Sequence, residues 1–107
     1  MYQGTTPTIP VRFKGADLTE AKIYLTIEDE DKKKQITFES GDDFTVEYDG
    51  TDTTGTIRLT QEQTLAMSPG YCYVQARFIF ADGNSGATTE TRIFINPVIL
   101  KGVITYE

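Results

Sequence analysis

The chain has few side chains that could carry out chemistry. It contains no histidine, and Cys72 is its single thiol. Without an imidazole it can form neither a Ser-His-Asp nor a Cys-His arrangement, and it lacks the commonest metal ligand of proteins. A zinc site would have to be built almost entirely from carboxylates, which is not how zinc is usually held. The sequence therefore predicts a protein that is not an enzyme, with no catalytic, cofactor-binding or metal-binding residue.

Cys72 is flanked by alternating apolar residues in a predicted strand. A thiol in the middle of a strand, on its core-facing side, is usually buried and unreactive. A single cysteine also excludes a disulfide within the chain and is typical of a reducing compartment. We therefore expect Cys72 to be a packing residue.

Four aspartates, Asp42, Asp43, Asp49 and Asp52, lie in two turns around a predicted strand. Calcium takes six to eight oxygen ligands, and this spacing does not match the EF-hand pattern. A carboxylate pair could also serve glycoside hydrolysis, although the deep cleft this requires is hard to build on a small domain. We interpret the aspartates as ordinary polar turns, and the sequence alone does not decide whether they bind calcium.

The net charge of −6 limits the partners. Nucleic acids and anionic membranes are bound by clustered Lys and Arg, so we predict neither as a partner. No apolar run approaches the roughly 20 residues that span a bilayer. Residues 1–7 carry no basic and apolar regions of the kind that form a signal peptide.

Apolar residues alternate with polar ones along most of the chain, which is typical of strands with one buried face. The clearest case is Ala21–Glu28, where Ala21, Ile23, Leu25 and Ile27 share one face. The other predicted strands are Thr8–Lys14, Gln35–Glu39, Phe44–Tyr48, Thr56–Thr60, Tyr71–Phe80 and Ala87–Asn96.

Several local signals place these strands. Pro10 cannot donate a ladder hydrogen bond, so its strand belongs at a sheet edge or at a switch between sheets. The charged run over residues 28–34 predicts a solvated hairpin tip, and Asp82-Gly83 predicts a second hairpin turn. In the strand Phe44–Tyr48 we expect Phe44, Val46 and Tyr48 on one face.

A capping box, with Thr60 as N-cap and Gln63 three residues later, predicts one helical turn before Pro69-Gly70. We expect Leu65 to be the residue that this turn buries. Residues 1–7 are rich in Gly, Thr and Pro and are predicted to form a flexible arm.

With 107 residues, these elements predict a single domain over residues 1–107. The fold expected is all-β, an immunoglobulin-like antiparallel sandwich of about seven strands with one short helical turn. A partly open barrel is the alternative.

Two regions are candidate interfaces. Tyr, Phe and Arg side chains are enriched in protein interfaces, and several are expected on the outer face of the last hairpin. Cross-strand pairing that only stabilises the sheet is the alternative reading of the same residues. The apolar C-terminal tail strengthens the interface reading, since exposed apolar segments on small domains usually dock on something. The predicted interface residues are Tyr71, Tyr73, Arg77, Ile79, Arg92, Phe94, Val98, Ile99 and Leu100.

The stretch Ile57–Leu65, followed by Pro69-Gly70-Tyr71, Val74–Arg77, Asp82-Gly83 and Pro97-Val98, resembles a group of small prophage proteins. Those proteins open with a Gly-Thr-Thr-Pro-Thr arm, which Gly4–Thr8 matches. They are similar to the N-terminal domains of phage baseplate upper proteins, which have an immunoglobulin-like fold. The matching motifs are a capped turn and a hairpin, and Cys72 between two tyrosines departs from the pattern.

The segment over residues 57–73 also resembles the corner between strands E and F of immunoglobulin domains. In that comparison Leu59, Leu65 and either Tyr71 or Tyr73 fill the corner positions. The Tyr-to-Cys spacing of antibody domains is absent, so this likeness concerns the fold only.

The resemblance to prophage proteins implies a structural protein of the phage tail or baseplate region, located in the virion or the cytoplasm of a bacterial host. Its partners would be other phage structural proteins, and symmetric particles would also suit a homo-oligomer. The alternative is a small ligand-binding or carbohydrate-binding sandwich, in which exposed tyrosines stack on sugar rings. The lack of Trp weakens that alternative.

Overall fold

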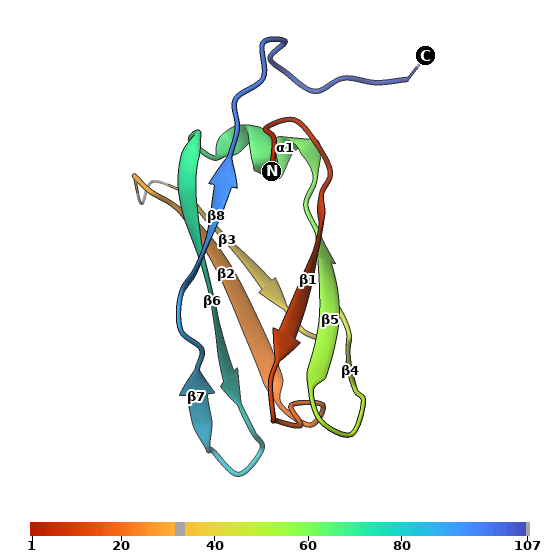
Figure 1. Ribbon diagram of the computed structural model, residues 1–107. Helices are drawn as coiled ribbons and strands as arrows, with labels where there is room; N and C mark the ends of the chain where they lie inside the picture. The colour runs from red at the N-terminus through yellow and green to blue at the C-terminus, as the bar shows by residue number, and fades with distance from the viewer. Residues whose placement is uncertain (32–33, 107) are drawn as a thin grey trace.

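The computed structural model, which describes residues 1–31 and 34–106, consists of two antiparallel sheets packed face to face (Figure 1). The smaller sheet has the order β1-β5-β4, with β1 at Thr8–Phe13, β5 at Thr53–Arg58 and β4 at Val46–Tyr48. In the larger sheet the order is β3-β2-β6, and both β7 and β8 pair with the far side of β6. Its strands are β3 at Gln35–Glu39, β2 at Lys22–Asp29, β6 at Gly70–Ile79, β7 at Ser85–Ala87 and β8 at Thr91–Ile95.

The strand order is that of an immunoglobulin-like sandwich. The sheet β4-β5-β1 corresponds to strands D, E and B, and β3-β2-β6-β8 corresponds to C′, C, F and G. The short helix α1, Gln61–Ala66, joins β5 to β6 where the E–F connection lies. The predicted all-β sandwich with one helical turn is confirmed.

The core lies between the inner faces of the two sheets. On β2, Ile23, Leu25 and Ile27 are buried as the alternation predicted. On β6, the buried Ala76 lies opposite Leu25, and the buried Cys72 lies opposite Asp29. The fully buried Ile57 and Leu59 extend this core from the end of β5 toward α1.

The capping box predicted at the start of α1 is present. The Thr60 hydroxyl accepts from the Gln63 N–H at 3.1 Å, and the Gln63 side-chain oxygen accepts from the Thr60 N–H at 2.9 Å. The prediction that Leu65 is the residue buried by this turn is wrong, because Thr64 and Met67 fill that place and Leu65 is half-buried. Leu65 lies beside Gly4, so it covers the start of the chain instead of the core.

Strand β5 begins three residues earlier than predicted, at Thr53 instead of Thr56. Thr53 has no exposed surface, and its hydroxyl accepts from the Leu18 N–H at 2.9 Å and donates to the Ala16 oxygen at 2.6 Å. These two bonds attach the connection between β1 and β2 to the strand. A polar run of Thr, Asp and Gly is typical of a turn, which is why the sequence did not indicate a buried strand start here.

Strand β4 is shorter than the predicted Phe44–Tyr48. Phe44 is buried but forms an isolated bridge with Ser40, and the strand itself covers Val46–Tyr48. Of the three residues predicted to share one face, Phe44 is buried and Val46 is half-buried, whereas Tyr48 is exposed. Because β4 is an edge strand, the core does not extend over its far end.

The predicted return strand Ala87–Asn96 is divided in two by a bulge. Before the break Arg77 lies opposite Ala87, and after it Tyr73 lies opposite Arg92, so residues 88–90 contain one residue more than the matching part of β6. The Thr88 hydroxyl accepts from the Ala76 N–H at 3.0 Å, which holds the irregular segment against β6.

The bulge decides which side chains face the core. In β7 the odd-numbered residues face outward with Arg77 and Ile79, whereas in β8 the even-numbered Arg92 and Phe94 face outward. One extra residue moves every following side chain to the other face of the sheet. This shift places Ile93 and Ile95 on the core side.

The first residues of the chain, which we predicted to form a flexible arm, make several contacts with the domain. Asn96 donates its N–H to the Met1 oxygen at 2.7 Å, and Gln3 donates its N–H to the Asn96 oxygen at 2.9 Å. The buried Gln3 side chain also donates to the Met67 oxygen at 2.8 Å. This short parallel pairing covers part of the free edge of the sheet beyond β8.

The hairpin predicted at residues 28–34 is present, since β2 and β3 pair with Glu28 opposite Gln35. Lys32 and Lys33 of its charged tip lie outside the described residues.

Candidate functional site

The structure brings three of the predicted interface residues into one cluster on the outer face of the larger sheet. Tyr71 of β6 lies opposite Phe94 of β8, and the two rings meet edge to face with centroids 5.2 Å apart. The Arg92 guanidinium lies over the Tyr71 ring, 4.6 Å from its centroid. Tyr71 is 40% exposed and Phe94 is 45% exposed. We call Tyr71, Arg92 and Phe94 the aromatic cluster.

Edge-to-face aromatic pairs and guanidinium–ring contacts are favourable arrangements. They hold the three side chains in a fixed shape while leaving much of their surface exposed. Tyr and Arg in such a setting are typical of the anchoring residues of protein interfaces. Tyr73, opposite Arg92, extends the cluster along β6 and is half-buried.

Arg77 and Ile79 do not join the aromatic cluster. They lie on the same face of β6 but opposite Ala87 and Ser85 of β7, and Arg77 is about 20 Å along the strand from Tyr71. Ile79 is exposed and has Lys22 of β2 as its other cross-strand neighbour. The predicted face is therefore one face of the sheet, but it does not form one patch.

The apolar tail, residues 98–106, leaves the domain at the end that carries α1, and Figure 1 shows it running away from both sheets. Of the predicted interface residues in it, Val98 is half-buried near Gly4, whereas Leu100 is exposed. Ile99 is 102% exposed and Tyr106 is 105% exposed relative to the free residues. Val103 and Ile104 are exposed as well.

The tail is held in place by polar contacts. The Gln61 side chain donates to the Ile104 oxygen at 3.0 Å and accepts from the Ile104 N–H at 2.9 Å, as a neighbouring strand would. The Lys101 ammonium donates to the Gln3 side-chain oxygen at 3.3 Å. Backbone and polar groups thus fix the direction of the tail while its apolar side chains face outward.

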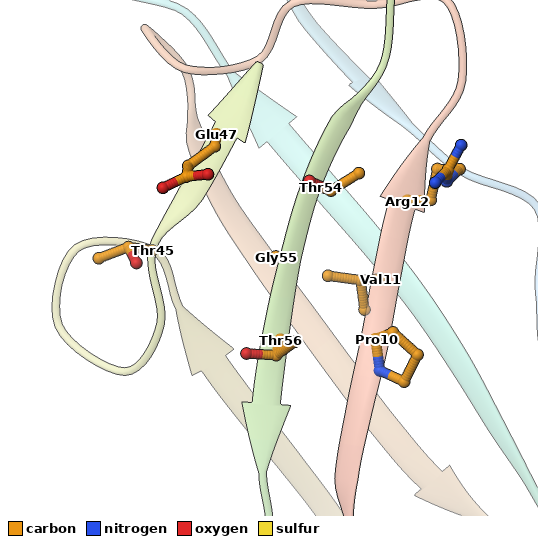
Figure 2. Close-up of a pocket in the computed structure, with 8 residues that line it drawn as sticks. All are labelled: Pro10, Val11, Arg12, Thr45, Glu47, Thr54, Gly55 and Thr56. Carbon is orange, nitrogen blue, oxygen red and sulfur yellow. The ribbon is translucent and has the colours of Figure 1, made fainter. Parts of the chain in front are cut away.

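A shallow, open hollow of about 690 Å³ lies on the outer face of the smaller sheet (Figure 2). Its polar lining residues include Arg12 of β1, Thr54 and Thr56 of β5, and Glu47 of β4. Glycoside hydrolysis needs a pair of carboxylates, and Glu47 is the only carboxylate among the eight lining residues. The hollow therefore does not present the carboxylate pair of a glycosidase.

Three of the four aspartates in the two turns, Asp43, Asp49 and Asp52, accept hydrogen bonds from backbone N–H groups. Asp49 accepts from the N–H groups of Thr51 and Asp52, and these bonds lower the pKa of the Asp49 carboxyl. Asp52 forms an ion pair with Arg12 at 2.9 Å, and Asp43 accepts from the Glu39 N–H. Within residues 1–31 and 34–106, no group of three or more Asp, Glu, Cys or His could hold a metal ion.

Cys72 is buried in the core, as predicted. Burial raises the pKa of its thiol, so the reactive thiolate is disfavoured. The tyrosines assigned to the E–F corner are placed differently from expectation: Tyr71 and Tyr73 are both on the outer face, whereas Leu59 is buried as in a corner. The corner role predicted for Tyr71 or Tyr73 is therefore wrong, because both rings point away from the core.

Among the described residues, α1 is the one helix, and it is far too short to cross a membrane. The sequence matches no protein-family model, and the search of curated proteins gave no significant match.

Proposed function

We propose that this chain is a non-enzymatic structural protein of the phage or prophage tail or baseplate region, acting through protein–protein assembly. The observation that supports assembly most strongly is the apolar tail, in which Ile99, Leu100, Val103, Ile104 and Tyr106 are all exposed. A contiguous exposed apolar segment marks a contact surface in most soluble domains.

The phage setting is supported by the resemblance of the Gly4–Thr8 arm, the capped turn after β5 and the Asp82-Gly83 hairpin to small prophage proteins. The immunoglobulin-like sandwich is the fold that this resemblance implies. The resembling motifs are the ones that shape the α1 end and the β6–β7 hairpin, and the α1 end carries the tail.

The test is to look for the chain in particles. After prophage induction of the source bacterium, particles are purified on a density gradient, washed in high salt and examined by quantitative mass spectrometry. We expect the chain at a fixed copy number per tail, and immunogold labelling at the tail end. Its confinement to the soluble cell fraction, together with host marker proteins, would overturn the proposal.

The second candidate function is carbohydrate binding, which the exposed rings of Tyr71 and Phe94 favour. Two features of the aromatic cluster weigh against a sugar platform. Arg92 covers one face of the Tyr71 ring, and Phe94 meets the same residue edge to face. A glycan array decides the matter: binding that Tyr71→Ala abolishes would establish this alternative, and no binding on the array would remove it.

A further inference from the structure

We propose that copies of this chain join by strand addition: the apolar tail of one copy pairs with the free edge of β1 in a second copy. The inference rests on the proposed assembly function and names its first partner.

The edge of β1 is open along its length. Within residues 1–31 and 34–106, β1 pairs with β5 alone, and the bond from the Leu59 N–H to the Pro7 oxygen fixes the alternation of the ladder. Residues 9, 11 and 13 therefore direct their backbone groups toward β5, while Thr8, Pro10 and Arg12 direct theirs outward. Pro10 supplies a carbonyl but no donor, so the edge offers N–H groups from Thr8 and Arg12 and three carbonyl oxygens.

A groove of mixed polarity, with apolar side chains along its floor, runs beside this edge. It has a volume of about 300 Å³ and lies between β1 and the segment of residues 88–93, where the two sheets of the sandwich are not closed over each other. Ile9, Val11, Val74 and Ile93 line it and remain only partly buried. In this groove, core side chains of the domain are therefore still partly exposed.

The tail of the same chain has the complementary properties. Val103-Ile104-Thr105-Tyr106 is a run of strong strand formers, none of which belongs to a strand. In an extended chain Ile104 and Tyr106 share one face, and Val103 and Thr105 the other. Of the two registers of a strand docked on β1, the one that places Ile104 and Tyr106 in the groove buries more apolar surface than the one that places Val103 and Thr105 there. Adding an extended segment to an open sheet edge is an established mode of peptide recognition.

The occupant is a second copy because of where the tail lies. It leaves from the α1 end, is held there by Gln61, and points away from the sandwich. At that end the gap beside β8 is already closed by the pairing of Met1 and Gln3 with Asn96. A tail that joins one copy to the next is a head-to-tail contact, which yields a ring when the rotation closes and a filament when it does not.

The test uses the full chain and two matched double variants. Ile104→Asn with Tyr106→Ser changes the face that enters the groove, and Val103→Asn with Thr105→Ser changes the opposite face. All four residues are exposed, so every variant should fold with the wild-type thermal midpoint. Light scattering over a concentration series should show wild-type oligomers, a dissociation constant at least tenfold higher for the first variant, and a change below about threefold for the second.

Amide hydrogen exchange locates the contact. On oligomerisation of the wild type, the Thr8 and Arg12 amides should gain protection of at least tenfold. The amide of Thr37, on the outer edge of β3 at the far side of the larger sheet, should not change. A wild type that stays monomeric at millimolar concentration would overturn the inference, as would oligomers that survive the first variant or protect Thr37 instead of Thr8.

The test of strand addition and the test of the phage assignment can fail independently of each other. Oligomers that show this pattern but never enter particles would support strand addition and refute the phage assignment. A strict monomer found at fixed copy number in tails would do the reverse.

Discussion

Thr53 shows how much one side chain can hold together in this protein. Its hydroxyl accepts from the Leu18 N–H in a buried hydrogen bond and donates to the Ala16 carbonyl in a partly buried one, and Thr53 itself has no exposed surface. The sequence did not indicate this role, since a threonine within a polar run is usually a surface residue. The role of a buried hydroxyl becomes visible only when the structure places its hydrogen-bond partners beside it.

Thr53→Val should lower the free energy of unfolding by about 1–3 kcal/mol, because the isosteric side chain removes the hydrogen bonds of the buried Leu18 N–H and the partly buried Ala16 carbonyl. Urea denaturation measures the change. Thr53→Ser keeps the hydroxyl and should retain most of the stability. Equal stability of the valine variant and the wild type would show that the two bonds contribute nothing net.

Cys72 gives the stability a dependence on alkaline pH. Burial raises the pKa of its thiol in the folded state, so the unfolded state releases the proton first as the pH rises. The stabilisation is fully present below the unfolded pKa of about 8.5 and is lost as the pH rises toward the folded pKa. Between about pH 8 and 10, the free energy of unfolding of Cys72→Ala should therefore decrease less than that of the wild type, although the variant is the less stable protein at neutral pH. Parallel curves for the two proteins would contradict this.

At the scale of elements, the period-two pattern was enough to place β2, β3 and the long strand β6. Ile23, Leu25 and Ile27 sit where alternation puts them, because a strand with one buried face leaves that pattern whatever its neighbours are. The aromatic cluster could not be predicted to the residue. The hairpin turn alone would set Tyr71 opposite residue 93, and the bulge at residues 88–90 shifts its partner to Phe94.

The pairing of β4 with β5 depends on Gly55. A Cβ atom there would lie 2.7 Å from the Thr45 carbonyl oxygen, a backbone atom that cannot turn aside. Figure 2 shows Gly55 in the middle of β5, between β1 and β4. The sequence placed this glycine in a loop, so the close approach of the two strands was not predicted.

Gly55→Ala should destabilise the protein by about 1–3 kcal/mol, since β4 must move outward to admit the methyl group. Thr56→Ala, on the exposed face of the same strand, is the matched control and should change stability by less than about 0.5 kcal/mol. Chemical denaturation compares the two. If Gly55→Ala were as stable as Thr56→Ala, the close contact between Gly55 and the Thr45 carbonyl would not restrict the residue at position 55.

At the scale of the whole molecule, the sandwich contains the core, whereas the tail keeps its apolar side chains exposed. Tail residues such as Ile104 and Tyr106 lie outside the core, because their side chains are exposed. The sequence predicted an apolar tail and its role in contact, but not the open β1 edge with its adjoining groove. The one sequence feature that indicated an edge at β1 was Pro10, which cannot donate a ladder hydrogen bond.

Incorporation of tail variants into particles tests the account most directly. A prophage lacking the gene is complemented with the wild type, the Ile104→Asn/Tyr106→Ser double variant, or the Val103→Asn/Thr105→Ser control, and the copy number in purified tails is measured. We predict wild-type levels for the control and at least a tenfold loss for the first variant, with all three folded and equally abundant in the cell. Equal incorporation of all three proteins would contradict the account.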